Sequence, residues 1–327
     1  MKKLKWGILG TAYICERDTI PGMLKANNCE LYAIAGRNPD KVRVFVEKYG
    51  FEKGYDSYMA LLEDPEVEAV YIPLPNTMHY EWTIEALKHK KPVLCEKPLA
   101  PTAQQVAEMF AAAKENGVCL MEAFAYLQSP YVQAVAEELK NGSIGKVRYM
   151  HVHFLTSDYD RSNIRMRKET LGGSMYDIGV YASSLILRLL GENPERIQAA
   201  AAFDEHHIDK LTTVMLEYPD AVRAVLTAGM VMATEKNKSS DSFEIQGTEG
   251  TLRSDHFTFN GNGELSYYVN RFDGTAEYKT VAVPNNYTLE IEQFGRCVAE
   301  GEAPVVTEII SNANARLVDK VLKDIVY

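Results

Sequence analysis

The sequence has no apolar stretch that approaches the roughly 18 residues of a membrane span, so we expect no membrane partner. It also has nothing typical of a secretory signal. The basic start, residues 1–7, continues directly into a strand-like run without an apolar core or a cleavage site, so we expect a cytoplasmic protein. Internal repeats and low-complexity segments are absent as well.

Cysteine is scarce and poorly spaced for a disulfide framework or a zinc site. The cysteines are odd in number, form no C-x-x-C pair and mostly stand in apolar, strand-like contexts. They are Cys15, Cys29, Cys95, Cys119 and Cys297. We expect buried, reduced thiols. His151 and His153 alternate along one predicted strand without a third ligand at a recognisable spacing, so no metal is expected.

Basic charge is also in deficit, which disfavours a nucleic-acid partner. The 45 Asp and Glu residues outnumber the 35 Lys and Arg residues, giving a net charge of −10 and a pI near 5.3. Polyphosphate partners favour a basic face, and none is apparent. The remaining features are those of an ordinary globular protein, with 46% hydrophobic residues in a chain of 327, long enough for two domains.

The first part of the chain alternates short apolar runs with amphipathic segments, a pattern typical of parallel strands joined by helical crossovers. The apolar runs cover residues 4–9, 31–35, 69–74, 92–95 and 118–121. The helix-like segments between them cover residues 40–49, 57–63, 77–88 and 102–116. The pattern therefore predicts an α/β domain at residues 1–121, a doubly wound parallel sheet of the Rossmann type that binds a dinucleotide.

After about residue 145 the pattern changes to long runs in which apolar and polar residues alternate. Turn signals such as Pro219-Asp220 and Gly261-Asn262-Gly263 separate these runs and indicate a mostly antiparallel, open sheet. One helix at about residues 173–190 interrupts the pattern, and two more follow at about 289–300 and 307–324. Residues 122–327 are thus predicted to form an α+β domain.

The first β-α junction is the place where a dinucleotide-binding fold holds the phosphates. The residues there are Gly10, Thr11, Ala12, Tyr13 and Ile14. Only the first glycine of G-x-G-x-x-G is present, so an ordinary tight turn is the alternative interpretation. The helix that follows would offer unpaired N–H groups to a phosphate, which favours the binding role.

The end of the second strand distinguishes between cofactors. It has no carboxylate that would accept the ribose 2′-hydroxyl, and Arg37 stands where a guanidinium would pair with a 2′-phosphate. The sequence therefore favours NADP(H), and NAD(H) is the alternative if Arg37 is an ordinary surface arginine.

Two further strand ends place polar groups at the carboxyl edge of the sheet, where open α/β sheets bind ligands. The fourth strand is followed by Leu74, Pro75, Asn76 and His79, which we expect at the cofactor. Asn76 is also a candidate cap for the next helix, and a packing role is the alternative for His79. The fifth strand ends at Glu96 and Lys97, which we also expect at the cofactor. A lysine partly withdrawn from water there suits proton transfer.

These motifs together resemble the Gfo/Idh/MocA oxidoreductase family: the turn at residues 10–12, the segment 75–79 and the Glu-Lys-Pro of residues 96–98. The resemblance continues through residues 163–165 and 171–181, where the family has Gly-Gly, Asp-x-Gly and then His or Tyr. A tyrosine in that last position is similar to the branch containing glucose–fructose oxidoreductase, dimeric dihydrodiol dehydrogenase and NADP-linked D-xylose dehydrogenase. The resemblance implies that the second domain binds substrate and forms a homodimer or higher oligomer through the open face of its sheet.

Asp177 and Tyr181 are four residues apart, so we expect both to point from one helix face into a common cleft. In the similar branch, the tyrosine and the lysine of Glu-Lys-Pro are regarded as the acid/base apparatus, which implies catalytic roles for Tyr181 and Lys97. A phenol has an unperturbed pKa of about 10, and a nearby cation would lower it. Asp177 would orient the substrate or the tyrosine, and Asn163 and Arg165 are expected to contact the substrate.

The resulting hypothesis is an NADP(H)-dependent oxidoreductase that transfers a hydride between the nicotinamide and a secondary alcohol or carbonyl of a sugar, cyclitol or dihydrodiol. One alternative is a nicotinamide-sensing regulator without turnover, although such a protein need not keep Lys97, Asp177 and Tyr181. Another is an NAD-dependent glycosidase of the same fold, which would show no net change in cofactor absorbance. We expect substrate selectivity to depend on the loops at residues 157–167 and 230–241.

Overall fold

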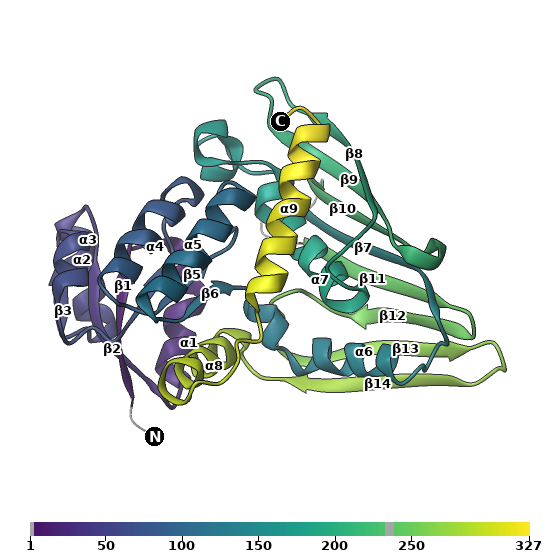
Figure 1. Cartoon of the computed structure of the whole chain (residues 1–327), viewed down its shortest axis with the longest axis horizontal. Helices are drawn as coiled ribbons and strands as arrows, with labels where there is room; N and C mark the ends of the chain where they lie inside the picture. The colour runs from purple at the N-terminus through teal and green to yellow at the C-terminus, as the bar shows by residue number, and fades with distance from the viewer. Residues whose placement is uncertain (1–2, 233–238) are drawn as a thin grey trace. The chain divides into compact units, whose positions relative to one another are not determined.

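The computed structural model describes residues 3–232 and 239–327, and the chain divides into two compact units. The N-terminal unit comprises residues 1–128 and 285–308, and the C-terminal unit comprises residues 129–284 and 309–327. Both are drawn in Figure 1. Residues 233–238 of the second expected selectivity loop lie outside the described residues.

A six-stranded parallel sheet forms the centre of the N-terminal unit, in the order β3-β2-β1-β4-β5-β6. The strands are β1 (Leu4–Leu9), β2 (Cys29–Ala35), β3 (Lys53–Tyr55), β4 (Ala69–Ile72), β5 (Val93–Glu96) and β6 (Leu120–Ala123). This order confirms the predicted Rossmann sheet. Because β1 pairs with β4, the strand order reverses between them, and the loops after these two strands flank the point where such sheets bind ligands.

Helices connect these strands, and local capping explains where several of them begin and end. They are α1 (Ile20–Lys25), α2 (Pro39–Tyr49), α3 (Tyr58–Glu63), α4 (His79–Lys88) and α5 (Ala103–Asn116). The Asn38 side chain accepts a hydrogen bond from Lys41 N at the start of α2, and Thr102 accepts one from Gln105 N at the start of α5. Gly117, in a left-handed conformation, ends α5.

Helix α8 (Asn286–Glu300) belongs to the N-terminal unit although it is encoded far along the chain. It lies beside α1 in Figure 1, and the rings of Trp6 and Phe294 are 5.3 Å apart. The Asn28 side chain donates to the Glu292 carbonyl at 2.9 Å. The predicted division between residues 121 and 122 assigned this helix to the second domain, because an amphipathic pattern does not reveal which partner covers its apolar face.

The C-terminal unit is built on an eight-stranded sheet, in the order β14-β13-β12-β11-β7-β10-β9-β8. Among the described strands of this sheet, only β7 and β10 pair in parallel, which confirms the mostly antiparallel sheet. The strands are β7 (Val147–Ser157), β8 (Arg196–Phe203), β9 (Asp209–Glu217), β10 (Arg223–Met232), β11 (Ser239–Gly247), β12 (Gly250–His256), β13 (Gly263–Arg271) and β14 (Ala276–Val283).

Three helices cover one face of this sheet: α6 (Pro130–Lys140), α7 (Val180–Leu190) and α9 (Glu308–Asp324), as Figure 1 shows. The side chains that face them, such as Val152, Leu226 and Ile245, are fully buried. The alternate residues of the same strands point to the opposite face. Among the described helices, none is both long and apolar enough to cross a membrane.

Candidate functional site

The turn after β1 brings backbone into close approach at the carboxyl edge of the parallel sheet. Gly10 has a φ of 130°, a conformation that favours glycine, and a Cβ there would lie 3.2 Å from Leu74 Cδ2. Gly10 N donates to the Ala35 carbonyl at 2.8 Å, and Cys15 N donates to the Ala12 carbonyl at 3.0 Å. The helical run that follows, residues 13–25, begins in this turn. The geometry suits a phosphate approaching the backbone.

Arg37 lies directly after β2, and its side chain is exposed. Burial raises the pKa of Tyr58, and the nearby Arg37 guanidinium opposes that shift. The arginine that was predicted to distinguish NADP from NAD is therefore accessible to an anionic ligand.

His79 lies behind the loops that follow β4 and β5. It is 0% exposed, with Nδ1 at 2.8 Å from the Pro98 carbonyl and Nε2 at 2.7 Å from the Leu74 carbonyl. Burial lowers the pKa of His79, and the two carbonyls oppose the shift. The Lys97–Pro98 peptide bond is cis. His79 thus joins the two loops that carry the expected cofactor contacts, as a packing group would.

Asn76 does not cap α4, contrary to one of its predicted roles. It lies in a 3-10 turn, Asn76–Met78, and α4 begins only at His79 with Met78 at the N-cap and no side-chain cap. The inserted turn moves the helix start away from Asn76 and keeps the residue at the strand end.

Glu96 occupies a polar niche at the end of β5. Its Oε1 accepts a hydrogen bond from the Tyr71 hydroxyl at 2.7 Å, and its Oε2 accepts one from Lys97 N at 3.3 Å. Desolvation raises the pKa of Glu96, while Tyr71 and Lys97 oppose the shift. Glu122, which the sequence did not single out, accepts from Leu99 N at 3.0 Å and fixes the same loop. The one sequence feature that could have pointed to Glu122 is its position as a charged residue within a short apolar strand.

In the C-terminal unit, the structure brings together Asn163, Arg165 and Asp177. Arg165 Nε donates to Asp177 Oδ2 at 2.6 Å in an ion pair, and the Asn163 side chain accepts from Arg165 N at 3.0 Å. The Arg165 guanidinium also lies 5.2 Å from the centre of the Tyr159 ring. Because Asp177 raises the pKa of Arg165, the arginine is charged at all accessible pH values.

Two adjacent glycines allow this arrangement. A Cβ on Gly172 would lie 2.4 Å from the Arg165 carbonyl oxygen, and one on Gly173 would lie 1.8 Å from Asp209 Oδ1. Asp209 is fully buried and accepts hydrogen bonds from Met175 N and the Ser174 hydroxyl, both at 2.8 Å. The glycines therefore let the loop carrying Arg165 pack directly against the start of the helical segment that carries Asp177.

The sequence predicted that Asp177 and Tyr181 share one face of a single helix. The structure places them in two consecutive helical segments instead. Asp177 lies in a π-helical segment, Met175–Gly179, and Tyr181 lies in the first turn of α7. Both still act on the same arginine, because the pKa of Arg165 is raised first by Asp177 and, more weakly, by Tyr181. π-helical segments of this kind are frequent at functional sites.

Tyr181 is partly buried in an aromatic setting with one polar neighbour. Its ring lies 5.7 Å from that of Phe154 and 5.5 Å from that of Phe259, and Asn260 Nδ2 donates to its hydroxyl at 3.4 Å. Asp241 Oδ2 accepts from Phe259 N at 3.1 Å and holds this turn. Sequence reasoning missed Asn260, because an asparagine next to a glycine is ordinary turn chemistry and only tertiary packing brings it to Tyr181.

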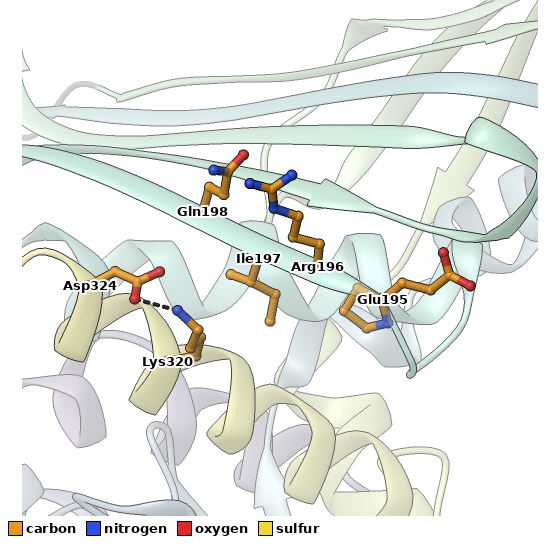
Figure 2. A pocket seen from close by; sticks show the side chains of 7 residues that line it. Glu195, Arg196, Ile197, Gln198, Lys320 and Asp324 are labelled. Carbon is orange, nitrogen blue, oxygen red and sulfur yellow. Dashed lines mark hydrogen bonds and ion pairs between the residues drawn. The ribbon is translucent and has the colours of Figure 1, made fainter.

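A surface pocket of about 540 Å³ lies elsewhere in the C-terminal unit, between the start of β8 and α9 (Figure 2). Ile197 points towards α9, whereas Arg196 and Gln198 point away, and Lys320 pairs with Asp324. None of the predicted site residues lines it. Nor do any three His, Cys, Asp or Glu side chains of the described residues gather as a metal site would require.

Comparison with known proteins gives a consistent result along the chain. A family model described as the oxidoreductase family with an NAD-binding Rossmann fold (GFO_IDH_MocA) matches residues 4–124, and the GFO/IDH/MocA C-terminal domain model matches residues 132–253. The chain is 33% identical to a dTDP-3,4-didehydro-2,6-dideoxy-alpha-D-glucose 3-reductase from Actinomadura kijaniata, over 97% of this chain and 94% of that protein.

Two other relatives and a solved structure extend this similarity. A D-xylose 1-dehydrogenase (NADP(+)) from Haloferax volcanii is 33% identical, over 97% of this chain and 96% of that protein. A trans-1,2-dihydrobenzene-1,2-diol dehydrogenase from Xenopus laevis is 29% identical, over 98% of both. The structure of a 3-ketoreductase from Actinomadura kijaniata with NADP and TDP-benzene matches with a TM-score of 0.92 and 31% identity, over 99% of this chain and 98% of that one.

Proposed function

Because the chain belongs to the Gfo/Idh/MocA family of oxidoreductases, we propose that it is an NADP(H)-dependent enzyme acting on a CH–OH or carbonyl group of a sugar or diol. The relatives named above reduce or oxidise such groups, according to their names. The hydride passes between the nicotinamide and the substrate carbon.

One observation supports the assignment of Lys97 and Tyr181 as the reacting groups. The ketoreductase from Actinomadura kijaniata has been solved with phenylalanine in place of one tyrosine and with alanine or glutamate in place of one lysine. Those two residues have the same separation in sequence as Lys97 and Tyr181. A shared separation in chains that align almost end to end supports Lys97 and Tyr181 as the equivalent pair.

The N-terminal unit has the features that a dinucleotide requires. The turn of residues 10–14 would hold the pyrophosphate, Arg37 the 2′-phosphate, and the strand-end residues Leu74, Pro75, Asn76, Glu96 and Lys97 the nicotinamide half. The close approach at Gly10 and the exposed guanidinium of Arg37 fit this group. His79 supports the loops from behind. When bound, the nicotinamide supplies hydride transfer.

The residues of this chain supply proton transfer and orientation. Tyr181 takes the substrate hydroxyl proton during oxidation or returns it during reduction, and Asn260 holds the phenol oxygen. Lys97 stabilises the developing alkoxide. Arg165, held by Asp177 and Asn163, presents a fixed cation to a substrate oxygen, so Asp177 acts through the arginine.

The decisive experiment is titration with NADPH and NADH, followed by absorbance at the nicotinamide band with aldoses, keto-sugar nucleotides, inositols and dihydrodiols. Tight NADPH binding with a substrate-dependent absorbance change supports the proposal. Binding without any absorbance change would favour the regulator or the glycosidase, and failure to bind either nucleotide would contradict the proposal entirely.

Arg37 should determine the choice between the two nucleotides. We expect Arg37→Ala to weaken NADPH binding by about 10-fold or more, the loss of one charge-assisted pair, and to leave NADH binding nearly unchanged. Arg43→Ala is the matched control, because Arg43 is an exposed arginine of α2 that pairs with Asp40. Equal losses for the two nucleotides would remove Arg37 from the 2′-phosphate site.

The outer face of the eight-stranded sheet supports a homodimer, which the family resemblance implies. Leu155 points to this face, because its neighbour Phe154 packs against Tyr181 on the helix side. Tyr278 is 55% exposed, and its ring lies 4.8 Å from that of Tyr268. The aromatic pair on this face supports a self-complementary contact with a second copy. A cytoplasmic location also stays a prediction, which cell fractionation would test.

A further inference from the structure

A buried chain of hydrogen bonds joins three neighbouring elements of the N-terminal unit. The Tyr71 hydroxyl donates to Glu96 Oε1 at 2.7 Å and lies 2.9 Å from the Thr19 hydroxyl. Tyr71 and Thr19 are both 0% exposed. Tyr71 is on β4, Glu96 is the last residue of β5, and Thr19 ends the π-helical segment Cys15–Thr19 that follows the turn after β1. The chain thus connects elements next to the three loops that carry the expected cofactor contacts.

The chain has a defined direction. A phenol has one proton, and Tyr71 gives it to the Glu96 carboxylate, so the Thr19 hydroxyl donates to the Tyr71 oxygen. Donation by Thr19 polarises the phenol and strengthens its hydrogen bond to Glu96. The carboxylate is also held on its other oxygen, because Lys97 N donates to Glu96 Oε2 at 3.3 Å. Glu96 is therefore fixed on both oxygens, directly beside Lys97.

Polar side chains are not needed here to fill the sheet. Tyr71 stands in the strand Ala69–Ile72, whose other residues are apolar and fully buried. A phenylalanine would fill nearly the same space, whereas a buried phenol, hydroxyl and carboxylate each cost free energy unless they are paired. A local cost of this kind, placed next to a proposed reacting group, favours a role of the chain in function.

We propose that Tyr71 is a positioning residue for Lys97. Its hydroxyl, oriented by Thr19, fixes the Glu96 carboxylate, and this anion attracts the Lys97 ammonium and limits where that side chain lies. The proposal rests on the proposed function, in which Lys97 stabilises the developing alkoxide. Because Tyr71 is fully buried, it acts through Glu96 and not by contact with the substrate.

The surroundings of Glu96 predict how a change at Tyr71 affects the pH dependence. Burial raises the pKa of Glu96, and the Tyr71 hydrogen bond and the Lys97 charge oppose that shift. Removing the phenol oxygen therefore raises the pKa of Glu96 further, so the carboxylate becomes protonated at a higher pH. The other titratable side chains that act on Glu96 keep their charges in such a variant, and they are Asp18 and Cys15 after β1, Cys95 on β5 and Glu290 on α8.

The experiment compares Tyr71→Phe with the unaltered protein, using the substrate of the panel above that gives the largest absorbance change. We expect kcat to fall about 10-fold, the loss of one hydrogen bond to a charged group, with the Kd for NADPH nearly unchanged. The acid limb of the kcat profile should move to higher pH, which a merely structural role would not cause. Tyr55→Phe is the matched control and should change neither, since the Tyr55 hydroxyl also donates to a carboxylate at 2.7 Å, that of Asp64 after α3.

Thr19→Val tests the direction of the chain, because valine keeps the shape of threonine and removes the hydroxyl that donates to Tyr71. We expect kcat to fall about 2- to 3-fold. The double variant with Tyr71→Phe should be no slower than Tyr71→Phe alone, since both substitutions act through the same carboxylate.

Three results would overturn the proposal and leave the proposed function intact: a Tyr71→Phe variant that matches Tyr55→Phe in kcat and pH profile, a loss of NADPH binding in place of the loss of kcat, or losses that multiply in the double variant. An unaltered protein without any turnover would contradict the proposed function, and this proposal with it. If Tyr71→Phe fails to fold, as circular dichroism would show, the kcat and pH profile of Thr19→Val decide in its place.

Discussion

Tyr181 is the residue at which the proposed reaction can be tested most directly, because its hydroxyl is held by Asn260 and its ring is fixed by two phenylalanines. Tyr181→Phe keeps the ring and removes the proton-transfer group. We expect turnover to fall by about 10²- to 10⁴-fold, with the Kd for NADPH unchanged. Tyr218→Phe is the control, since the Tyr218 hydroxyl donates to the Gly191 carbonyl at the opposite end of α7 from Tyr181. Turnover of Tyr181→Phe within a few-fold of normal would contradict the acid/base role.

Glu290 is a second residue that leads to a prediction, here about how the stability of the folded protein depends on pH. It is 1% exposed on α8, and its Oε1 has no hydrogen-bond partner among the described residues. Desolvation, together with the nearby Glu96, raises the pKa of Glu290 well above its usual 4.5. The folded state therefore binds a proton that the unfolded state releases, so this contribution to stability is present at low pH and is lost as the pH rises through the folded pKa.

We accordingly expect Glu290→Gln to raise the Tm at pH 8 by about 2–4 °C, roughly 1 kcal/mol for a protein of this size, and to have little effect near pH 4.5. Thermal unfolding followed by circular dichroism at both pH values measures the difference. Glu300→Gln, an exposed position on the same helix, should change the Tm at neither pH. An effect of Glu290→Gln that is equal at both pH values would mean that a buried charge is not its cause.

At the scale of elements, the Gly172-Gly173 pair determines whether the π-helical segment can form next to the Arg165 loop. Gly173→Ala should destabilise the protein by about 2–4 kcal/mol, because the new Cβ would displace the buried Asp209 carboxylate and the backbone conformation is strained. Gly191→Ala is the matched control. Gly191 also has a positive φ, 107°, at the other end of α7, but a Cβ there meets nothing within 4 Å. Denaturant unfolding should show a loss of only about 1–2 kcal/mol for Gly191→Ala, and equal losses would refute the steric explanation.

The sequence was sufficient to predict those helices and strands whose local amino-acid pattern agrees with the final structure. The five parallel strands with strong apolar runs were predicted, but the short β3 was not. Strand β8 was also missed, because it contains the run Ala199–Ala202, a typical helix former, and becomes a strand only by pairing with β9. In the candidate site, the matching motifs predicted roles for Arg165, Asp177 and Tyr181, and these roles stay predictions. The Arg165–Asp177 pair depends on how the loop folds back on the start of the next helical segment, and the contact of Asn260 with Tyr181 depends on packing between segments 79 residues apart. Periodicity encodes neither.

At the scale of the whole molecule, the outer face of the eight-stranded sheet leads to a prediction about the oligomeric state. Leu155→Asp places a charge on that face, near the C-terminal end of the central strand β7, and should convert a homodimer into monomers in analytical ultracentrifugation. Leu24→Asp, on an exposed position of α1 in the N-terminal unit, should leave the sedimentation coefficient unchanged. If the unaltered protein sediments as a monomer, the outer sheet face is not a dimer interface.

The late position of α8 in the chain affects how the N-terminal unit folds during synthesis. The ribosome releases the whole parallel sheet early, yet the helix that covers Trp6 and binds Asn28 is synthesised only after the entire antiparallel sheet. The nascent nucleotide-binding unit must therefore wait, with that apolar surface uncovered, until translation has passed residue 300. We expect a fragment that ends after residue 128 to keep this surface exposed and therefore to be prone to aggregation.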